Sequence, residues 1–203
     1  MHSRRCDAVM FVARAPACDA RPSVPDNGPV FNRVARSRTG LASSTVYRRA
    51  DAYYVIGRAI TTDGVWLFDG EPAIQISLDG SAIALGSAIE SAISGDLPIV
   101  RHPARDEWAE DIKRRYAPLL RQARVQSRKA FEAGAAMASI DRDGDEVVVI
   151  PMKQDTRKPD VWLESPAQAT SLTRAGAEVL GNAVALVLAK GSAQYDGHSP
   201  RGA

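Results

Sequence analysis

The sequence contains few of the residues that build metal centres or covalent cross-links. Its 203 residues include two cysteines and three histidines. Two cysteines exclude a disulfide scaffold and a zinc site with four cysteine ligands. No apolar run approaches the roughly 20 residues that a transmembrane helix needs. The 26 basic and 24 acidic side chains nearly balance, so the overall charge does not indicate a nucleic-acid partner.

The motifs of common enzyme classes are also missing. The patterns GxSxG, GxGxxG and GxxxxGK[ST] do not occur, which removes the usual hydrolase, dinucleotide and phosphate-loop signatures. His102 is the only histidine away from the chain ends, so neither a zinc site nor a catalytic histidine is expected. The run Asp-Arg-Asp-Gly-Asp-Glu begins like a calcium loop, but Gly144 and Met152 occupy the wrong loop positions. We predict a protein that is not an enzyme, with no catalytic residues, metal or cofactor.

The charge and proline distribution divides the chain into a head, a body and a tail. Residues 1–45 hold seven arginines, three aspartates and four prolines without periodicity. This composition predicts a disordered or loosely packed basic head, and removing it is expected to leave stability almost unchanged. Its short apolar stretch falls below the length of a secretory signal core. Residues 46–190 are expected to form a single α+β domain, and residues 191–203 a flexible tail.

The body contains an internal repeat. Three apolar motifs return in the same order about 95 positions later, which indicates two copies of one unit, at residues 46–95 and 136–190. The motif pairs are Tyr54-Val55-Ile56 with Val148-Val149-Ile150, Val65-Trp66-Leu67 with Val161-Trp162-Leu163, and Ala84-Leu85-Gly86-Ser87-Ala88-Ile89 with Val179-Leu180-Gly181-Asn182-Ala183-Val184. Two copies indicate pseudo-symmetry within one domain.

Each copy is predicted to contain antiparallel strands followed by a helix. The first copy has strand patterns at residues 52–61, 65–69 and 73–78 and a helix from Ser81 to about residue 94. The second has strand patterns at residues 136–142, 146–153, 161–163 and 169–172 and a helix capped by Thr173. Glycine inside a helix costs about 1 kcal/mol, so we expect Gly86 and Gly181 to allow close helix-to-sheet contact.

A long helix is expected between the copies, at residues 106–133, with a kink or break near Tyr116 because of Pro118. The predicted fold is therefore α+β, with two pseudo-repeats of antiparallel strands plus a helix joined by a long central helix. Residues 113–133 carry a net charge of +6 and residues 46–112 a net charge of −6. An alternative function is nucleic-acid binding through the basic helix at residues 113–129, although acidic surfaces nearby would weaken phosphate attraction.

Acidic side chains gather at two predicted turns, one in each copy. Acidic patches accelerate association with a basic partner and fix its orientation, so we take these side chains as candidate partner-binding residues. They are Asp69, Glu71, Asp141, Asp143, Asp145 and Glu146. A further alternative, an unfamiliar enzyme or small-ligand domain, requires a deep apolar pocket with converging polar groups.

The body resembles a known protein family over roughly residues 50–190. The similarity lies in the segment Gly144-Asp145-Glu146-Val147-Val148-Val149-Ile150-Pro151-Met152-Lys153 and in the later helix motif Leu180-Gly181-Asn182-Ala183-Val184, which Leu85-Gly86-Ser87-Ala88-Ile89 matches. These segments resemble the immunity proteins of contact-dependent growth inhibition systems, the CdiI proteins.

The resemblance implies a cytoplasmic bacterial protein without catalytic residues. Such a protein binds the C-terminal toxin domain of a secreted exoprotein, often a nuclease, and neutralises it by stoichiometric blocking. The expected partner is therefore a cognate toxin domain, with no membrane partner and with nucleic acid as the less favoured alternative.

Overall fold

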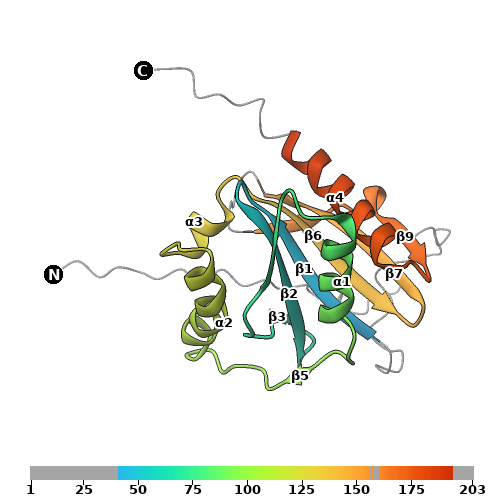
Figure 1. Ribbon diagram of the computed structural model, residues 1–203. Coiled ribbons are helices and arrows are strands. Elements are labelled where there is room, and N and C mark those ends of the chain that lie inside the picture. Colours follow the sequence, from blue (N-terminus) through green and yellow to red (C-terminus); the bar gives the residue numbers. More distant parts are fainter. Residues whose placement is uncertain (1–40, 156, 158–160, 194–203) are drawn as a thin grey trace, which may run out of the picture.

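The computed structural model describes residues 41–155, 157 and 161–193, which form a curled sheet with helices on both faces (Figure 1). Its helices are α1 (Ala82–Ala92), α2 (Trp108–Gln122), α3 (Arg128–Glu132) and α4 (Ala177–Ala193), with a short 3-10 turn, η2 (Pro166–Gln168). Its strands are β1 (Leu41–Arg48), β2 (Ala52–Thr61), β3 (Trp66–Phe68), β4 (Ile74–Ser77), β5 (Ile99–Val100), β6 (Ala136–Asp143), β7 (Glu146–Gln154), β8 (Trp162–Glu164) and β9 (Thr170–Thr173). The predicted α+β class is confirmed.

The two copies join edge to edge at the middle of the sheet. The strand order is β3-β2-β1-β6-β7-β8, and β1 and β6 are antiparallel partners along their whole length. Strand β4 pairs with β2 and β9 pairs with β7, so each copy adds two short strands to its long outer strand. Strand β5 adds a short parallel pair to β2. None of the described helices is long and apolar enough to cross a membrane.

The strand pairing of the two copies has the same register. A shift of 94 residues maps β1 and β2 onto β6 and β7, and a shift of 96 residues maps β3 and β4 onto β8 and β9. A pseudo-two-fold axis between β1 and β6 therefore relates the copies. Equivalent facing pairs are Ser44–Gly57 with Ala138–Pro151, Arg58–Phe68 with Met152–Glu164, and Ala52–Ser77 with Glu146–Thr173.

Helices α1 and α4 cross each other on one face of the sheet, above a core of alternating strand residues (Figure 1). At the crossing, a Cβ on Gly86 would overlap the backbone carbonyl of Ala177, and a Cβ on Gly181 would overlap that of Ala82. The two glycines are equivalent, as predicted. They allow the helices to approach each other, however, and not the sheet. Ser81 caps α1 by accepting a 3.1 Å hydrogen bond from the Ala84 amide.

The opposite face of the sheet is covered by α2 and α3 over part of its area. Tyr47 and Tyr54 from the strands pack edge-to-face on Phe131 of α3, and Trp162 of β8 packs edge-to-face on Tyr47. These side chains, with Leu119 and Ala123 near the end of α2, form a second buried core. We call this group the aromatic core.

The single long helix predicted between the copies is in fact two helices. Pro118 lies within α2 without breaking it, and the break comes after Ala123. Arg124 adopts a left-handed φ of 53°, and the Val125 amide donates to the Leu120 carbonyl, a Schellman closure. Glycine is the usual residue at this position, so the arginine gave no stop signal.

Two predicted boundaries are also wrong. The head was predicted to extend to residue 45, but residues 41–45 begin β1, where Ala42 and Ser44 are buried. Residues 1–40 and 194–203, the rest of the predicted head and most of the predicted tail, lie outside the described residues. Thr173 was predicted to cap the last helix, yet it ends β9 and α4 begins at Ala177.

Candidate functional site

The acidic side chains of the β6–β7 hairpin have different surroundings. Asp141 is half-buried, and its Oδ1 accepts a 2.6 Å hydrogen bond from the Ser43 hydroxyl on β1. Asp145, in the turn, forms a 2.9 Å ion pair with Arg174 and is largely exposed. Asp143 and Glu146 face each other as the last pair of the hairpin. Asp141 thus belongs to the interior of the sheet face, whereas the other three acids form the hairpin tip.

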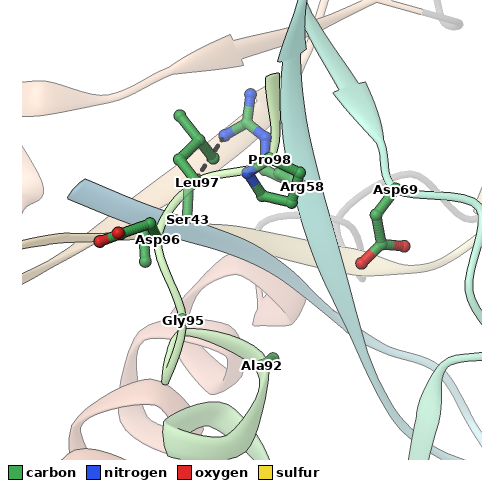
Figure 2. A pocket seen from close by; sticks show the side chains of 9 residues that line it. Ser43, Arg58, Asp69, Ala92, Gly95, Asp96, Leu97 and Pro98 are labelled. Carbon is green, nitrogen blue, oxygen red and sulfur yellow. Dashed lines mark hydrogen bonds between the residues drawn. The ribbon is translucent and has the colours of Figure 1, made fainter. Parts of the chain in front are cut away.

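The second acidic group, Asp69 and Glu71, lies in the loop after β3. The Asp69 carboxylate accepts the Glu71 amide at 2.9 Å and stands against Gly57 of β2. Gly57 and Arg58 are neighbours in a strand and point to opposite faces. Figure 2 shows Arg58 and Asp69 on opposite sides of the β2 ribbon. Asp69 and Asp141 are therefore on different faces of the sheet, and the structure does not bring the two predicted acidic groups together.

A polar cluster around Arg58 occupies the sheet face beside the aromatic core. Arg58 Nη1 donates to the Ser43 hydroxyl at 3.4 Å (Figure 2). The same nitrogen donates to the Ser139 hydroxyl of β6 at 2.8 Å. Its guanidinium stacks 4.5 Å from the centre of the Trp66 ring. We call this group the Arg58 cluster, and its members are Ser43, Arg58, Trp66, Ser139, Asp141 and Glu164.

The charged side chains of the Arg58 cluster are two carboxylates, Asp141 and Glu164, and one guanidinium. Burial lowers the pKa of the Arg58 guanidinium, and the charges of Asp141 and Glu164 oppose this effect. Burial raises the pKa of the Glu164 carboxyl, the Asp141 charge raises it further, and Arg58 only partly offsets both. The half-buried Asp141 and the exposed Glu164 therefore place two carboxylates in the electrostatic field of one guanidinium.

Sequence reasoning missed most of this cluster because its members come from five strands. One signal was available: Arg58 is a charged residue within an otherwise apolar strand of β-branched and aromatic residues. Such a residue is rarely buried without partners. The partners themselves were not identifiable, because Ser43, Ser139 and Glu164 become neighbours only through strand pairing.

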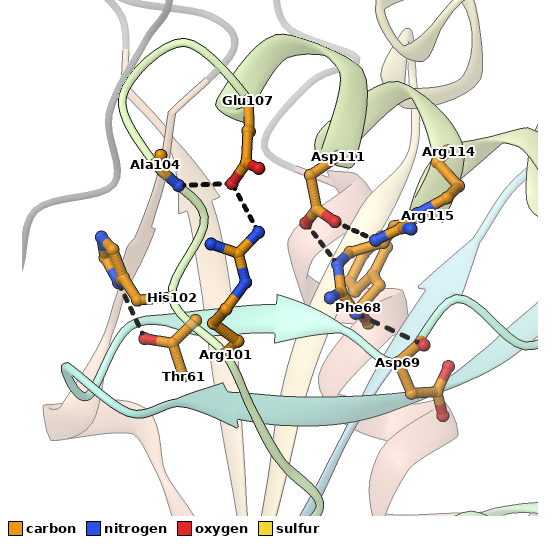
Figure 3. A network of polar contacts seen from close by, with 10 residues as sticks. All are labelled: Thr61, Phe68, Asp69, Arg101, His102, Ala104, Glu107, Asp111, Arg114 and Arg115. Carbon is orange, nitrogen blue, oxygen red and sulfur yellow. Dashed lines mark hydrogen bonds and ion pairs between the residues drawn. The ribbon is translucent and has the colours of Figure 1, made fainter.

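Much of the basic charge of residues 113–129 is engaged in holding α2 and α3 in place. Asp111 is buried and pairs with Arg114 and, at 2.6 Å, with Arg115 (Figure 3). Arg115 also donates to the Phe68 carbonyl at 2.8 Å, which ties α2 to the end of β3. Arg128 pairs with the buried Glu132 at 2.8 Å. Lys113, Arg114, Arg121, Arg124 and Lys129 are exposed, and of these Lys113 and Arg114 form ion pairs with Glu110 and Asp111 of their own helix.

The His102 side chain contacts Thr61 at the end of β2 and Trp108 at the start of α2. Its Nδ1 lies 3.1 Å from the Thr61 hydroxyl (Figure 3). Its ring packs edge-to-face on Trp108. In the described part of the chain, His, Cys, Asp and Glu side chains do not assemble in threes around a metal-sized space. A depression of about 150 Å³ lies beside Arg58 and Asp69, and one of about 350 Å³ lies between Arg142 and Arg174.

Solved structures that share this fold include the following two. A Neisseria meningitidis protein of unknown function, NMB0488, aligns with a TM-score of 0.61 at 16% sequence identity, covering 76% of this chain and 98% of that chain. A chain of the CdiA-CT/CdiI toxin and immunity complex from Yersinia pseudotuberculosis aligns with a TM-score of 0.59 at 14% identity, covering 74% and 97%. No protein-family model and no curated protein matches the sequence. At these identities the likeness establishes a shared fold.

Proposed function

We propose that this chain is a cytoplasmic immunity protein that binds and neutralises a cognate contact-dependent growth inhibition toxin domain. The main support for this proposal is the fold that this chain shares, over 74% of its length, with a chain of a toxin and immunity complex. The sequence motifs that resemble CdiI proteins support the immunity role over the toxin role, and they lie on β7 and on the crossing helices α1 and α4.

Neutralisation in this proposal is stoichiometric blocking, and the chain needs only a binding surface. The tip of the β6–β7 hairpin offers Asp143, Asp145 and Glu146. If the toxin is a nuclease, its substrate cleft is basic, and an acidic hairpin accelerates association and orients the complex. Asp69 and Glu71 lie on the other side of the sheet, so they are a second, separate candidate contact.

The experiment measures growth protection and binding. Cells express the C-terminal domain of the exoprotein encoded immediately upstream, together with the full chain or its variants. The double reversal Asp145→Lys/Glu146→Lys should weaken binding and protection, chiefly by slowing association. The matched control is Arg121→Glu/Arg124→Glu, which changes two exposed charges on α2 and just after it.

Asp141 and Arg128 are left unchanged in this comparison because both have internal partners, Ser43 and Glu132. Reversing either would confuse loss of folding with loss of binding. If the acidic variant protects fully while the arginine variant fails, the toxin binds the α2 side. If the unaltered chain neither protects cells nor binds the upstream domain, the immunity proposal is wrong.

A further inference from the structure

The pseudo-two-fold axis allows the two halves of the α2-covered sheet face to be compared position by position. One half of this face lies under α2 and α3 and takes residues from both copies. In this half Tyr47 of β1 is 1% exposed and Trp162 of β8 is 2% exposed, because α2 and α3 lie over them. The equivalent positions in the other half are Asp141 and Trp66, and Trp66 is 39% exposed. Met152, which packs against the aromatic core, corresponds to Arg58.

The symmetry is broken by the helices between the copies. Helices α2 and α3 cover the aromatic core, and the described part of the second copy contains no corresponding helix pair. The equivalent area therefore consists of the Arg58 cluster and the half-buried Val148, which faces Asp141 across the β6–β7 ladder. We call this area, made of the Arg58 cluster and Val148, the uncapped face.

The chemistry of the uncapped face defines what would cover it. It combines an exposed tryptophan stacked on Arg58, an apolar floor at Val148, and the carboxylates of Asp141 and Glu164, which outnumber the one guanidinium near them. Tryptophan and arginine are the residue types that most often dominate interface energies. The cover that the protein itself uses at the equivalent place, α2 and α3, spans residues 108–132 and has seven basic and three acidic side chains, a net charge of +4, with an apolar side.

We infer that the uncapped face is the docking surface for a basic, amphipathic segment of the toxin domain, which takes the place that α2 and α3 occupy over the other half. This inference rests on the immunity function proposed above. A lysine or arginine of the segment lies between Asp141 and Glu164, and an apolar side chain packs on Trp66 and Val148. The carboxylate pair gives the site its preference for a cation.

The first measurement is titration calorimetry of the full chain with the purified C-terminal domain of the upstream exoprotein. Trp66→Ala should raise the Kd about 30-fold or more, the range seen when a central interface tryptophan is truncated. The control is Leu186→Ala, which removes an apolar side chain that is 58% exposed on α4. It should leave the Kd within about two-fold, as expected for a residue outside the contact.

The second measurement needs no variant and so does not depend on how a substitution folds. Hydrogen exchange of the unaltered chain, with and without the toxin domain, should show added protection in β3, β8 and the β6–β7 hairpin. Binding with protection confined to α1 and α4, or with an unchanged Kd for a folded Trp66→Ala, overturns the inference and leaves the immunity function standing. Absence of binding overturns both.

Two other occupants of the uncapped face give different results. If deleting residues 1–40 raises exchange across this face in the free chain, the chain's own head covers it and the inference is wrong. If light scattering shows a dimer of the free chain that Trp66→Ala converts to a monomer, a second copy covers it and the inference is also wrong. The expected result is a monomer whose exchange at this face changes only on toxin binding.

Discussion

The crossing of α1 and α4 offers a sharp test of the repeat, through Gly86→Ala and Gly181→Ala. In an open helix, replacing glycine by alanine stabilises a protein by about 1 kcal/mol. Here the new Cβ would overlap a backbone carbonyl, of Ala177 or of Ala82, which cannot rotate away as a side chain could. Overpacking costs about 1–3 kcal/mol, and rigid neighbours place these sites at the upper end. We expect each substitution to lower the free energy of unfolding by about 2 kcal/mol.

The assay is thermal and urea unfolding of the full chain. A loss of about 2 kcal/mol lowers the Tm by about 4–8 °C in a protein of this size. The two single variants should agree closely because the sites are related by the pseudo-two-fold axis. The double variant should cost less than the two singles together, since the first alanine already separates the helices.

Gly95→Ala is the matched control, because a Cβ there meets no atom within 4 Å. It should change the free energy of unfolding by no more than about 0.5 kcal/mol. A stabilisation of about 1 kcal/mol by Gly86→Ala or Gly181→Ala would mean that helix propensity alone governs these sites. The proposed close contact would then be refuted.

Two further predictions concern stability. Deleting residues 1–45 should abolish cooperative unfolding, because it removes five residues of the central strand β1, whereas a deletion ending at residue 40 leaves β1 whole; equal melting curves would contradict this. Burial raises the pKa of Glu132, so the folded state holds its proton more tightly than the unfolded state. Its contribution to stability is present below the ordinary glutamate pKa and is lost as the pH rises through the raised value. Glu132→Gln should flatten that decline in a pH series of urea unfolding, and an unchanged slope would remove Glu132 as its cause.

The local elements were largely predictable from sequence. Residues 52–61 are rich in β-branched and aromatic side chains, which favour strands, and β2 has those bounds. Ser81 is a good N-cap residue before an apolar stripe, and α1 begins directly after it. The turns Asp63-Gly64 and Asp143-Gly144 marked the β2–β3 and β6–β7 connections, and both glycines have positive φ. These features depend on neighbours within a few residues.

The candidate site was predictable only in part. The acids of the β6–β7 hairpin were identified, and the tip is where the sequence placed it. Sequence did not show how these acids lie relative to Asp69, and strand alternation puts Asp69 and Asp141 on opposite faces of the sheet. Whether the hairpin acids bind a partner stays a prediction.

The sequence by itself determined the repeat, because duplicated apolar motifs at nearly constant spacing require equivalent surroundings in both copies. Only the tertiary structure decided that residues 41–48 form the strand joining them. That segment carries serines and a threonine, which in isolation do not indicate a core strand. Asp141 accepts a hydrogen bond from the buried Ser43 hydroxyl of this strand, and Arg58 donates one to the buried Ser139 hydroxyl of the neighbouring strand, whereas the buried Ser44 hydroxyl has no partner among the described residues. Long-range pairing supplies those partners, and no local pattern encodes it.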